Sequence, residues 1–424
     1  MRHWLPPIVL LTLAPVLVAA PTGLSETEAA IVAHAEAGMA RFVTDLEEAV
    51  NTSSATEDLE GVAKMGAIVV RQLAELGFDA RWVPLPPESG RSGHVVAERR
   101  GDRGKRILII GHLDTVYPGG NFRVEGDRAY GSGVNDMKGG NLVAIHALRA
   151  LHAAGALEDS QIIAVLTGDE ESPGKPLSVV RGALIDAAQR SDVALAFETA
   201  IRKTVTVARR GSMAWTLETD GVSAHSAGIF SERVGDGAVY EAARILTAFR
   251  EELRGEDGLT FNAALVAGGT TTSLEGTEAR ATGRANITAG KAIVRGDLRA
   301  MSQEQVDRVK ARMQEIVARN LPRTSATLKF SDDGYPPMAA TPENYALLAQ
   351  LAEVSRDLSY GDVEAFDPKG RGAGDISFVA PILPGLDGLG IRGEWAHSPD
   401  ESADLASVPE LVKRTAVLIH RLAR

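Results

Sequence analysis

The chain has 424 residues, 44% of them hydrophobic, and is long enough for two domains with separate cores. Its formal net charge of −11 argues against nucleic acid or an anionic membrane surface as a partner. The chain contains no cysteine, which excludes disulfides, thiolate metal sites and cysteine nucleophiles.

The first twenty residues have the pattern of a secretory signal peptide. Arg2 gives a basic start, an apolar stretch follows from Leu5, and the small residues Ala19 and Ala20 end it. The alternative is an uncleaved membrane anchor, for which the stretch is short and rich in proline. We therefore expect residues 1–20 to be removed and the mature protein to be exported without stable membrane association. Export without cysteines fits a bacterial periplasm.

Helix and strand patterns alternate from residue 26 to about 208. This alternation predicts an α/β domain with a largely parallel sheet, whose ligands bind at the carboxyl ends of the strands. The predicted strands cover residues 107–110, 162–166 and 193–197, and the clearest predicted helices cover 58–76, 139–154 and 179–188.

The pattern then changes to β-α-β-β-α-β, the ferredoxin-like order. Its predicted elements are strand 213–219, helix 236–253, strands 261–266 and 292–298, helix 303–319 and strand 326–330. We expect an inserted α+β domain over residues 209–331. The α/β pattern resumes with predicted helices at 342–355 and 408–422, so the first domain is discontinuous, formed by residues 26–208 and 332–424.

Polar residues follow each of the three predicted α/β strands. His112 ends the first, Glu170 and Glu171 follow the second, and Glu198 follows the third. Charge at the end of a buried strand costs stability unless it has a partner. With Asp136 and His397 these residues supply two histidines and three carboxylates for two zinc-like ions, with one acid left over.

One of the carboxylates must bridge the two ions, and Asp136 lies in a tight Gly-rich turn and is short enough to do so. His112 and Glu198 then complete one ion, and Glu171 and His397 complete the other. Two divalent ions about 3.5–4 Å apart polarise a carbonyl and make water nucleophilic near neutral pH.

Glu170 is not needed as a ligand and is predicted to be the general base, which moves the proton of that water to the leaving amine. Asp114 lies two residues after His112, on the same side of a strand. We expect its carboxylate to accept the ring N–H of His112 and fix the tautomer.

Other interpretations exist for each part of this pattern. Adjacent glutamates are mostly solvated surface, and a lone His-x-Asp is most often an ordinary hydrogen-bonded pair. The segment Gly131–Gly133 is similar to a dinucleotide loop but lacks its third glycine, because Asp136 occupies that place. The combination of residues therefore favours a metal site.

These motifs, in this order, resemble the zinc-dependent exopeptidase family of glutamate carboxypeptidases, aminoacylases and succinyl-diaminopimelate desuccinylase. The matching segments are Gly111–Pro118, Gly131–Gly139, Asp169–Glu171, Glu198 and His397. The resemblance covers nearly all of the mature chain. It implies two zinc ions on the ligands above, with cobalt and manganese as alternatives, and a cis peptide bond after Asp136. Glu198 favours the carboxypeptidase and desuccinylase branches.

In the inserted domain, Gly221–Ser226 is similar to a family segment whose histidine, here His225, reaches the active site of a partner subunit and binds the reacting carbonyl oxygen. The resemblance therefore implies a homodimer. Asn286 and Arg299 lie in stretches that resemble those holding the substrate carboxylate in glutamate carboxypeptidases. A planar guanidinium suits that role. Ala289 stands where the family usually has proline, which leaves the shape of that loop open.

Gly372 and Gly374 belong to a Gly-rich loop that resembles the family loop lining the substrate pocket. A phosphate-binding loop is the competing interpretation, but the G-K-(S/T) signature is missing. The remaining histidines have no paired context, and we read His146 and His152, on or near a predicted helix, as structural.

The sequence thus predicts a metal-dependent hydrolase that cleaves an amide next to a free carboxylate in a small peptide or an N-acyl amino acid, like a glutamate carboxypeptidase. One alternative is an aminoacylase or dipeptidase of the same family. Another is an inactive peptide-binding protein that retains the metals, against which the intact Glu170 argues.

Overall fold

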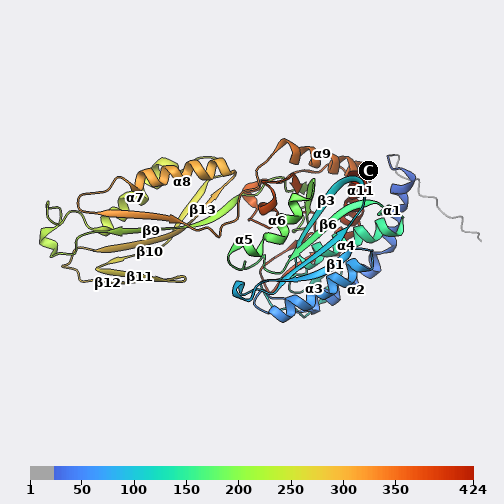
Figure 1. Ribbon diagram of the computed structural model, residues 1–424, viewed down its shortest axis with the longest axis horizontal. Coiled ribbons are helices and arrows are strands. Elements are labelled where there is room, and N and C mark those ends of the chain that lie inside the picture. The colour runs from blue at the N-terminus through green and yellow to red at the C-terminus, as the bar shows by residue number, and fades with distance from the viewer. Residues whose placement is uncertain (1–22) are drawn as a thin grey trace, which may run out of the picture.

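A computed structural model of the chain describes residues 23–424, and the expected signal peptide lies outside them. The molecule is elongated, with a larger lobe that carries both ends of the described chain and a smaller lobe that projects from it (Figure 1). Among residues 23–424, no helix combines the length and apolar character needed to cross a membrane.

A six-stranded sheet forms the centre of the larger lobe. In spatial order its strands are β1 (Asp79–Pro84), β2 (Gly93–Arg99), β6 (Ser160–Thr167), β3 (Arg103–His112), β7 (Val193–Ala196) and β16 (Gly385–Leu386). The last four run parallel, and β1 and β2 are antiparallel at one edge. The predicted, largely parallel sheet is therefore confirmed.

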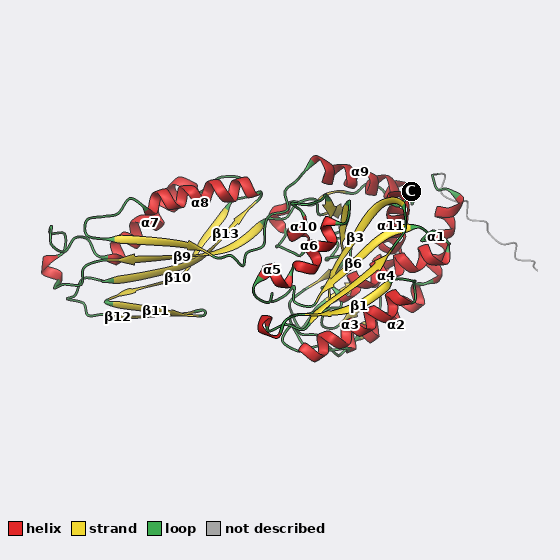
Figure 2. Cartoon of the chain, viewed as in Figure 1, coloured by secondary structure: helices red, strands yellow, loops and turns green. Residues whose placement is uncertain are grey.

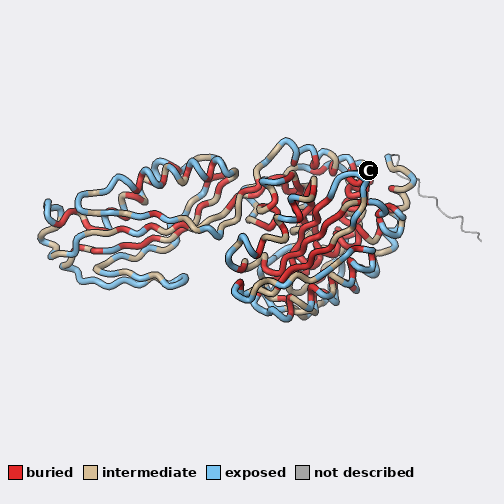
Figure 3. The backbone as a smooth tube through the Cα atoms, viewed as in Figure 1, coloured by how far each residue is buried: buried red, intermediate tan, exposed pale blue. Residues whose placement is uncertain are grey.

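Successive side chains of β3 enter two different apolar layers, because strand residues alternate between the faces of a sheet. Ile107 and Ile109 pack into the layer formed with α1 (Glu26–Ala37), α2 (Met39–Asn51), α3 (Leu59–Ala74), α4 (Lys138–Ala153), α9 (Pro342–Asp357) and α11 (Val408–Leu422). Leu108 and Ile110 face α6 (Gly182–Gln189) and α10 (Ile376–Val379). The central strands of the sheet are thus buried on both sides (Figure 3).

The predicted helix over 179–188 is divided in two. α5 (Leu177–Val180) ends at Arg181, and α6 begins at Gly182. The Arg181 side chain is fully buried and forms an ion pair with Asp169, which follows β6. Arg181 therefore contacts the end of β6 instead of continuing the helix.

The smaller lobe contains an antiparallel sheet in the order β10 (Thr260–Gly269), β13 (Lys291–Ala300), β9 (Gly211–Asp220) and β14 (Ser325–Phe330). Helices α7 (Ala238–Leu253) and α8 (Gln303–Val317) pack on it around Trp215 (Figure 2). The ferredoxin-like order is confirmed. A further hairpin, β11 (Thr271–Glu275) and β12 (Glu278–Thr282), was not predicted, because its strands bury no residue and carry no apolar alternation.

Two chain segments join the lobes, and they pair with each other. Arg209 is bridged to Met338, and Ser212 to Tyr335. Short strands also lie around the edge of the large sheet: β4 (Arg123–Glu125), β5 (Arg128–Tyr130), β17 (Gly393–Glu394) and β18 (Ser402–Asp404) form one sheet, and β8 (Thr204–Val205) pairs with β15 (Glu364–Ala365). The sheet of β4, β5, β17 and β18 brings the segment around His397 next to the Gly-rich turn that contains Asp136.

Candidate metal centre

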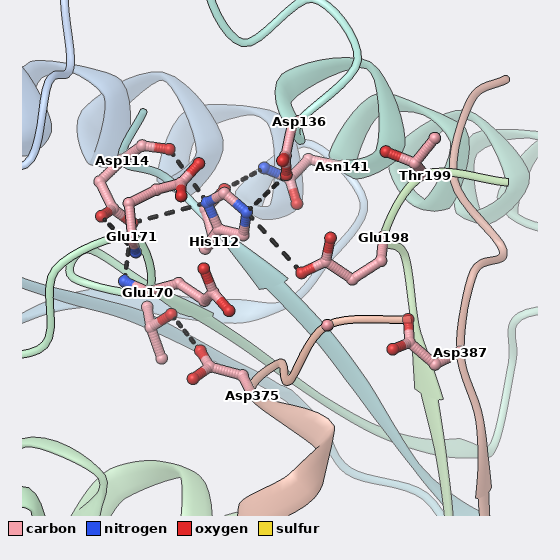
Figure 4. Close-up of polar contacts among 12 residues, drawn as sticks. His112, Asp114, Asp136, Asn141, Glu170, Glu171, Glu198, Thr199, Asp375 and Asp387 are labelled. Carbon is pink, nitrogen blue, oxygen red and sulfur yellow. Dashed lines mark hydrogen bonds and ion pairs between the residues drawn. The ribbon is translucent and has the colours of Figure 1, made fainter. Parts of the chain in front are cut away.

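The carboxyl ends of three neighbouring strands form the candidate site. β6, β3 and β7 are adjacent and parallel, so His112, the turn after Thr167 and Glu198 meet at one edge of the sheet. Figure 4 shows His112 at the centre, with carboxylates directed toward it.

The two carboxylate oxygens of Asp136 face different histidines. His112 Nε2 lies 3.2 Å from Asp136 Oδ1 and 3.8 Å from Glu198 Oε1. His397 Nε2 lies 3.1 Å from Asp136 Oδ2 and 3.0 Å from Glu171 Oε2. Asp136 therefore stands between two histidine–carboxylate pairs, in the arrangement that a bridging ligand requires.

The described residues contain three groups whose ligand atoms all lie within 4.8 Å of one another. Two of them share Asp136; the third is formed by His112 with both adjacent glutamates, Glu170 and Glu171. Glu171 Oε1 is buried and has no hydrogen-bond partner in residues 23–424. This set of ligand atoms fits a pair of zinc-like divalent cations. It consists of histidine nitrogens and carboxylate oxygens, and it includes the buried oxygen of Glu171 that has no hydrogen-bond partner.

Burial and mutual proximity disturb the ionisation of these groups. Burial raises the pKa of Glu170 well above its usual range, and burial together with the charge of Asp136 raises the pKa of Glu198 to about 8. Hydrogen bonds to Asp136 and Glu171 raise the pKa of His397 to about 11. Glu170, Glu198 and His397 thus hold protons more strongly when no cation is bound, and bound cations displace such protons.

The turn that carries Asp136 is fixed by Glu401, a residue that the sequence analysis did not single out. The buried carboxylate of Glu401 accepts the backbone N–H groups of Gly133, Asn135 and Asp136 at 2.7, 2.9 and 2.9 Å. No sequence motif marks this residue. Its four-residue distance from His397 is the only local signal.

Two backbone features shape the same turn. Gly133 has a φ of +73°, and a Cβ there would lie 2.4 Å from the side chain of Thr115, so only glycine fits. The peptide bond between Asp136 and Met137 is cis, as expected from the resemblance.

The Asp114 carboxylate holds the turn with the two glutamates. It accepts the backbone N–H of Glu170 at 3.0 Å and of Glu171 at 3.1 Å, and the Thr56 hydroxyl at 2.7 Å. His112 Nδ1 lies 2.9 Å from the backbone carbonyl oxygen of Asp114 and 3.5 Å from its carboxylate. The carbonyl, rather than the expected carboxylate, is therefore the nearer acceptor of the ring N–H.

Below this turn lies a buried charged network that was also not predicted. Arg181 forms ion pairs with Asp169 at 2.6 Å and with Asp375 at 2.9 Å, and Asp375 accepts the hydroxyl of Thr167 at the end of β6. The network fastens the end of β6 to the Gly-rich loop. The sequence contains no local signal that Arg181 would meet these two acids.

The Gly-rich loop forms one wall of a cavity of about 320 Å³ beside the metal centre, and Gly372 lines this cavity. Gly374 is buried behind it, where a Cβ would lie 3.0 Å from the Arg209 guanidinium. Arg209 forms a buried ion pair with Asp387 and donates to the carbonyl oxygens of Gly372 and Ala373 at 2.8 and 3.0 Å. Gly374 therefore supports the wall rather than facing the cavity.

The candidate residues of the smaller lobe lie away from this cavity. β9 begins at the connection between the lobes and spans about 33 Å, and His225 follows its far end. His225 and Asn286 are exposed neighbours there, since Ser226 N–H donates to Asn286 O at 2.9 Å. Arg299 lies near the connection, paired with Asp297 at 3.0 Å. One chain does not bring these three side chains to its own metal centre.

Residues 108–421 match the family model of Peptidase family M20/M25/M40. The chain therefore belongs to this family of metallopeptidases, and the expected family and enzyme class are confirmed.

Two relatives have names that bear on the substrate. The chain is 26% identical over 389 residues to carboxypeptidase G2 of Pseudomonas sp. (strain RS-16), with 89% of this chain and 88% of that protein covered. It is 26% identical over 366 residues to the succinyl-diaminopimelate desuccinylase of Gluconobacter oxydans (strain 621H), with 82% and 89% covered. These identities support peptidase or acyl-amino-acid hydrolase activity and do not separate the two substrates.

Among solved structures, the fold is similar to that of the YXEP protein of Bacillus subtilis, described as a dinuclear metal-binding peptidase from the M20 family. The TM-score is 0.64 at 14% identity, with 92% of this chain and 99% of that chain covered.

Proposed function

We propose that the chain is a two-zinc hydrolase that cleaves an amide bond next to a free carboxylate in a small peptide or an N-acyl amino acid. The observation that carries this proposal is the placement of Asp136 between two histidine–carboxylate pairs. The proposed ligands are His112, Asp136 and Glu198 for one ion, and Asp136, Glu171 and His397 for the other.

Glu170 is the proposed general base. Bound divalent cations supply a polarised carbonyl and a water of lowered pKa. Glu170 lines the cavity beside the ligands, and burial raises its pKa, so its carboxyl group can hold a proton taken from water and return it to the leaving amine. Its backbone is fixed by Asp114 and by the Tyr335 hydroxyl, which donates to Glu170 O at 2.9 Å.

The shape of the cavity supports a small substrate. It holds about 320 Å³, and its lining includes the proposed base Glu170 and the ligands Asp136, Glu198 and His397. His397 stands at its rim with 55% of its side chain exposed, whereas His112 is buried at the base with 1% exposed. A reacting amide can therefore enter past His397.

We also propose that the enzyme is an exported homodimer in which His225 serves the partner's active site. The exposure of His225 and Asn286 at the far end of the smaller lobe supports a role toward another chain. Cell fractionation of the producing organism tests the export, and recovery in the cytoplasm with an intact N-terminus would contradict it.

Removal of an N-acyl group is the second candidate. The desuccinylase relative is as similar in identity as the carboxypeptidase relative. An inactive binding protein is disfavoured, because Glu170 is held at the cavity by two backbone hydrogen bonds although neither proposed ligand set uses it.

A substrate panel tests the proposal. The purified protein, loaded in turn with zinc, cobalt and manganese, is assayed on dipeptides and N-acyl amino acids, each with a free and an amidated C-terminus. We expect hydrolysis of the free acids and slow turnover of the amidated partners. Equal rates on both would remove the free-carboxylate requirement, and no hydrolysis by protein carrying two ions would remove the enzyme assignment.

A further inference from the structure

One cationic side chain in the cavity beside the metal centre has no acidic partner. Arg371, in the Gly-rich loop, donates from Nε to Thr206 Oγ1 at 2.9 Å and from Nη2 to the Thr199 carbonyl oxygen at 2.6 Å. Its remaining nitrogen, Nη1, has no hydrogen bond, and the guanidinium has no ion pair, within the part of the chain that the structure describes.

The other charged groups that line this cavity outside the metal centre each form an ion pair with a group of opposite charge. Arg209 is neutralised by Asp387, and Glu394 is paired with Arg128. Two divalent cations would balance the four carboxylates of the centre, which are Asp136, Glu170, Glu171 and Glu198. Arg371 then remains as the uncompensated positive charge of the cavity.

Keeping this charge in place is unfavourable for the free protein. Burial, and the like charge of Arg209, lower the pKa of Arg371, and the more distant carboxylates of Asp387, Glu198 and Asp136 offset this only in part. A partly buried charge without a counter-ion destabilises the folded state unless a ligand supplies the counter-ion. Guanidinium groups suit carboxylates because their planar N–H groups match the carboxylate oxygens.

The contacts of Arg371 also fix the direction of the guanidinium. Thr206 is buried, and the Thr199 carbonyl belongs to the segment that follows the proposed ligand Glu198. Two of the three guanidinium nitrogens are thus held by hydrogen bonds, which leaves Nη1 to donate to a group in the cavity. A preorganised donor of this kind loses little conformational entropy when it binds.

We propose that Arg371 is a specificity-determining residue that binds, through Nη1, a carboxylate lying a few bonds from the amide that is cleaved. This inference rests on the proposed amide hydrolysis and names a recognition element within the same cavity. It differs from the expected role of Arg299, which lies on the smaller lobe and is paired with Asp297. The carboxylate can belong to the acyl side, as in a succinyl group, or to the amine side, as in an acidic amino acid.

Matched substrate pairs separate these two sources. The acyl-side pair is N-succinyl-alanine and its terminal amide analogue, and the amine-side pair is N-acetyl-glutamate and N-acetyl-glutamine. We expect Arg371→Met to lower kcat/KM for the acid member of one pair by about 10- to 100-fold, as for loss of a hydrogen bond to a charged group. The amide member should change little. The exposed Arg202→Met is the matched control and should behave like the wild type.

Equal losses for acid and amide members would show that Arg371 only holds the loop, and would overturn the proposal. Arg371→Lys retains the charge without the planar donor geometry, so we expect a smaller selective loss than with Met. If the Met variant does not fold, as judged by its thermal unfolding and by its turnover of the amide members, the selectivity of the Lys variant decides.

Direct binding provides a readout that does not depend on turnover. Calorimetric titration of succinate and of glutamate into wild type and Arg371→Met should show weaker binding to the variant for at least one of them. Equal affinities for both ligands would also overturn the proposal. If the wild type hydrolyses no member of the panel, the proposed function fails, and the titrations still decide the role of Arg371.

Discussion

The edge of the large sheet and the far end of the smaller lobe both present a histidine beside polar groups, but they differ in what surrounds it. His112 is buried and lies within 4 Å of two carboxylates that come from other segments of the same chain. His225 is exposed, and its ring nitrogen Nδ1 accepts a local N–H, that of Ala227, at 3.2 Å. The ends of parallel strands bring the residues of one centre together within a single chain. A residue at the far end of the smaller lobe needs the surface of a second chain to form a site.

The largest effect is expected from removing the residue shared by the two histidine–carboxylate pairs. Asp136→Ala should lose both ions and all measurable turnover, because each pair loses its common ligand. Elemental analysis of the purified variant and a turnover assay measure this, with the exposed Asp102→Ala as control. Two ions per chain in Asp136→Ala would refute the bridge.

The second test separates a base from a ligand. Glu170→Gln should keep both ions and lose turnover by about 10²–10⁴-fold, the usual contribution of a general base. Glu170 also belongs to one group of possible ligands, together with His112 and Glu171. The metal content of the variant therefore shows whether Glu170 is a ligand or a base. Loss of the ions with unchanged activity per bound metal would exchange the roles of Glu170 and Glu171.

The third test addresses the lobe tip. His225→Ala should bind metal normally and lose about 10²–10³-fold in rate, as when one donor to a developing oxyanion is removed. If His225 acts on the partner, mixed dimers of Glu170→Gln and His225→Ala chains should recover part of the activity, since one of their sites has both groups intact.

Two outcomes would contradict this role. Mixed dimers, verified by mass, that show no recovery would exclude action on the partner chain. A monomer at working concentration, measured by light scattering, would exclude the dimer itself.

The fourth and smallest effect concerns Asp114, which links the end of β3 to the turn after β6. Asp114→Ala should weaken metal affinity by about 10–100-fold, typical for residues that support ligands. Its carboxylate accepts the N–H groups of Glu170 and Glu171 and the hydroxyl of Thr56, so the turn loses three hydrogen bonds. Competition with a chelator measures the affinity. Wild-type affinity in the variant would mean that the turn holds its shape without Asp114.

The sequence predicted those parts of the fold whose signal is local. Apolar runs that end in His112, in Glu170 and before Glu198 identified the strands and the edge where they meet. The alternation of residues 213–219 identified β9 of the smaller lobe. Each of these patterns needs only one segment of chain to be recognised.

The missed residues depend on partners that are distant in the sequence. Glu401 reads as a surface acid, yet it holds a turn 265 residues earlier. Arg181 lies within a predicted helix, where nothing indicates that its side chain will enter the core to meet Asp169 and Asp375. Such contacts form only when the sheet brings the segments together, so periodicity does not reveal them.

The paired connection between the lobes has a consequence for protein engineering. Because Arg209 is bridged to Met338 and Ser212 to Tyr335, the chain leaves the larger lobe and returns to it at nearly the same point. We therefore expect that the whole segment from β9 to β14 can be removed as one unit. A short turn in its place, or the corresponding lobe of another chain grafted onto the two connecting segments, should alter the proposed dimer surface and leave every proposed metal ligand in position.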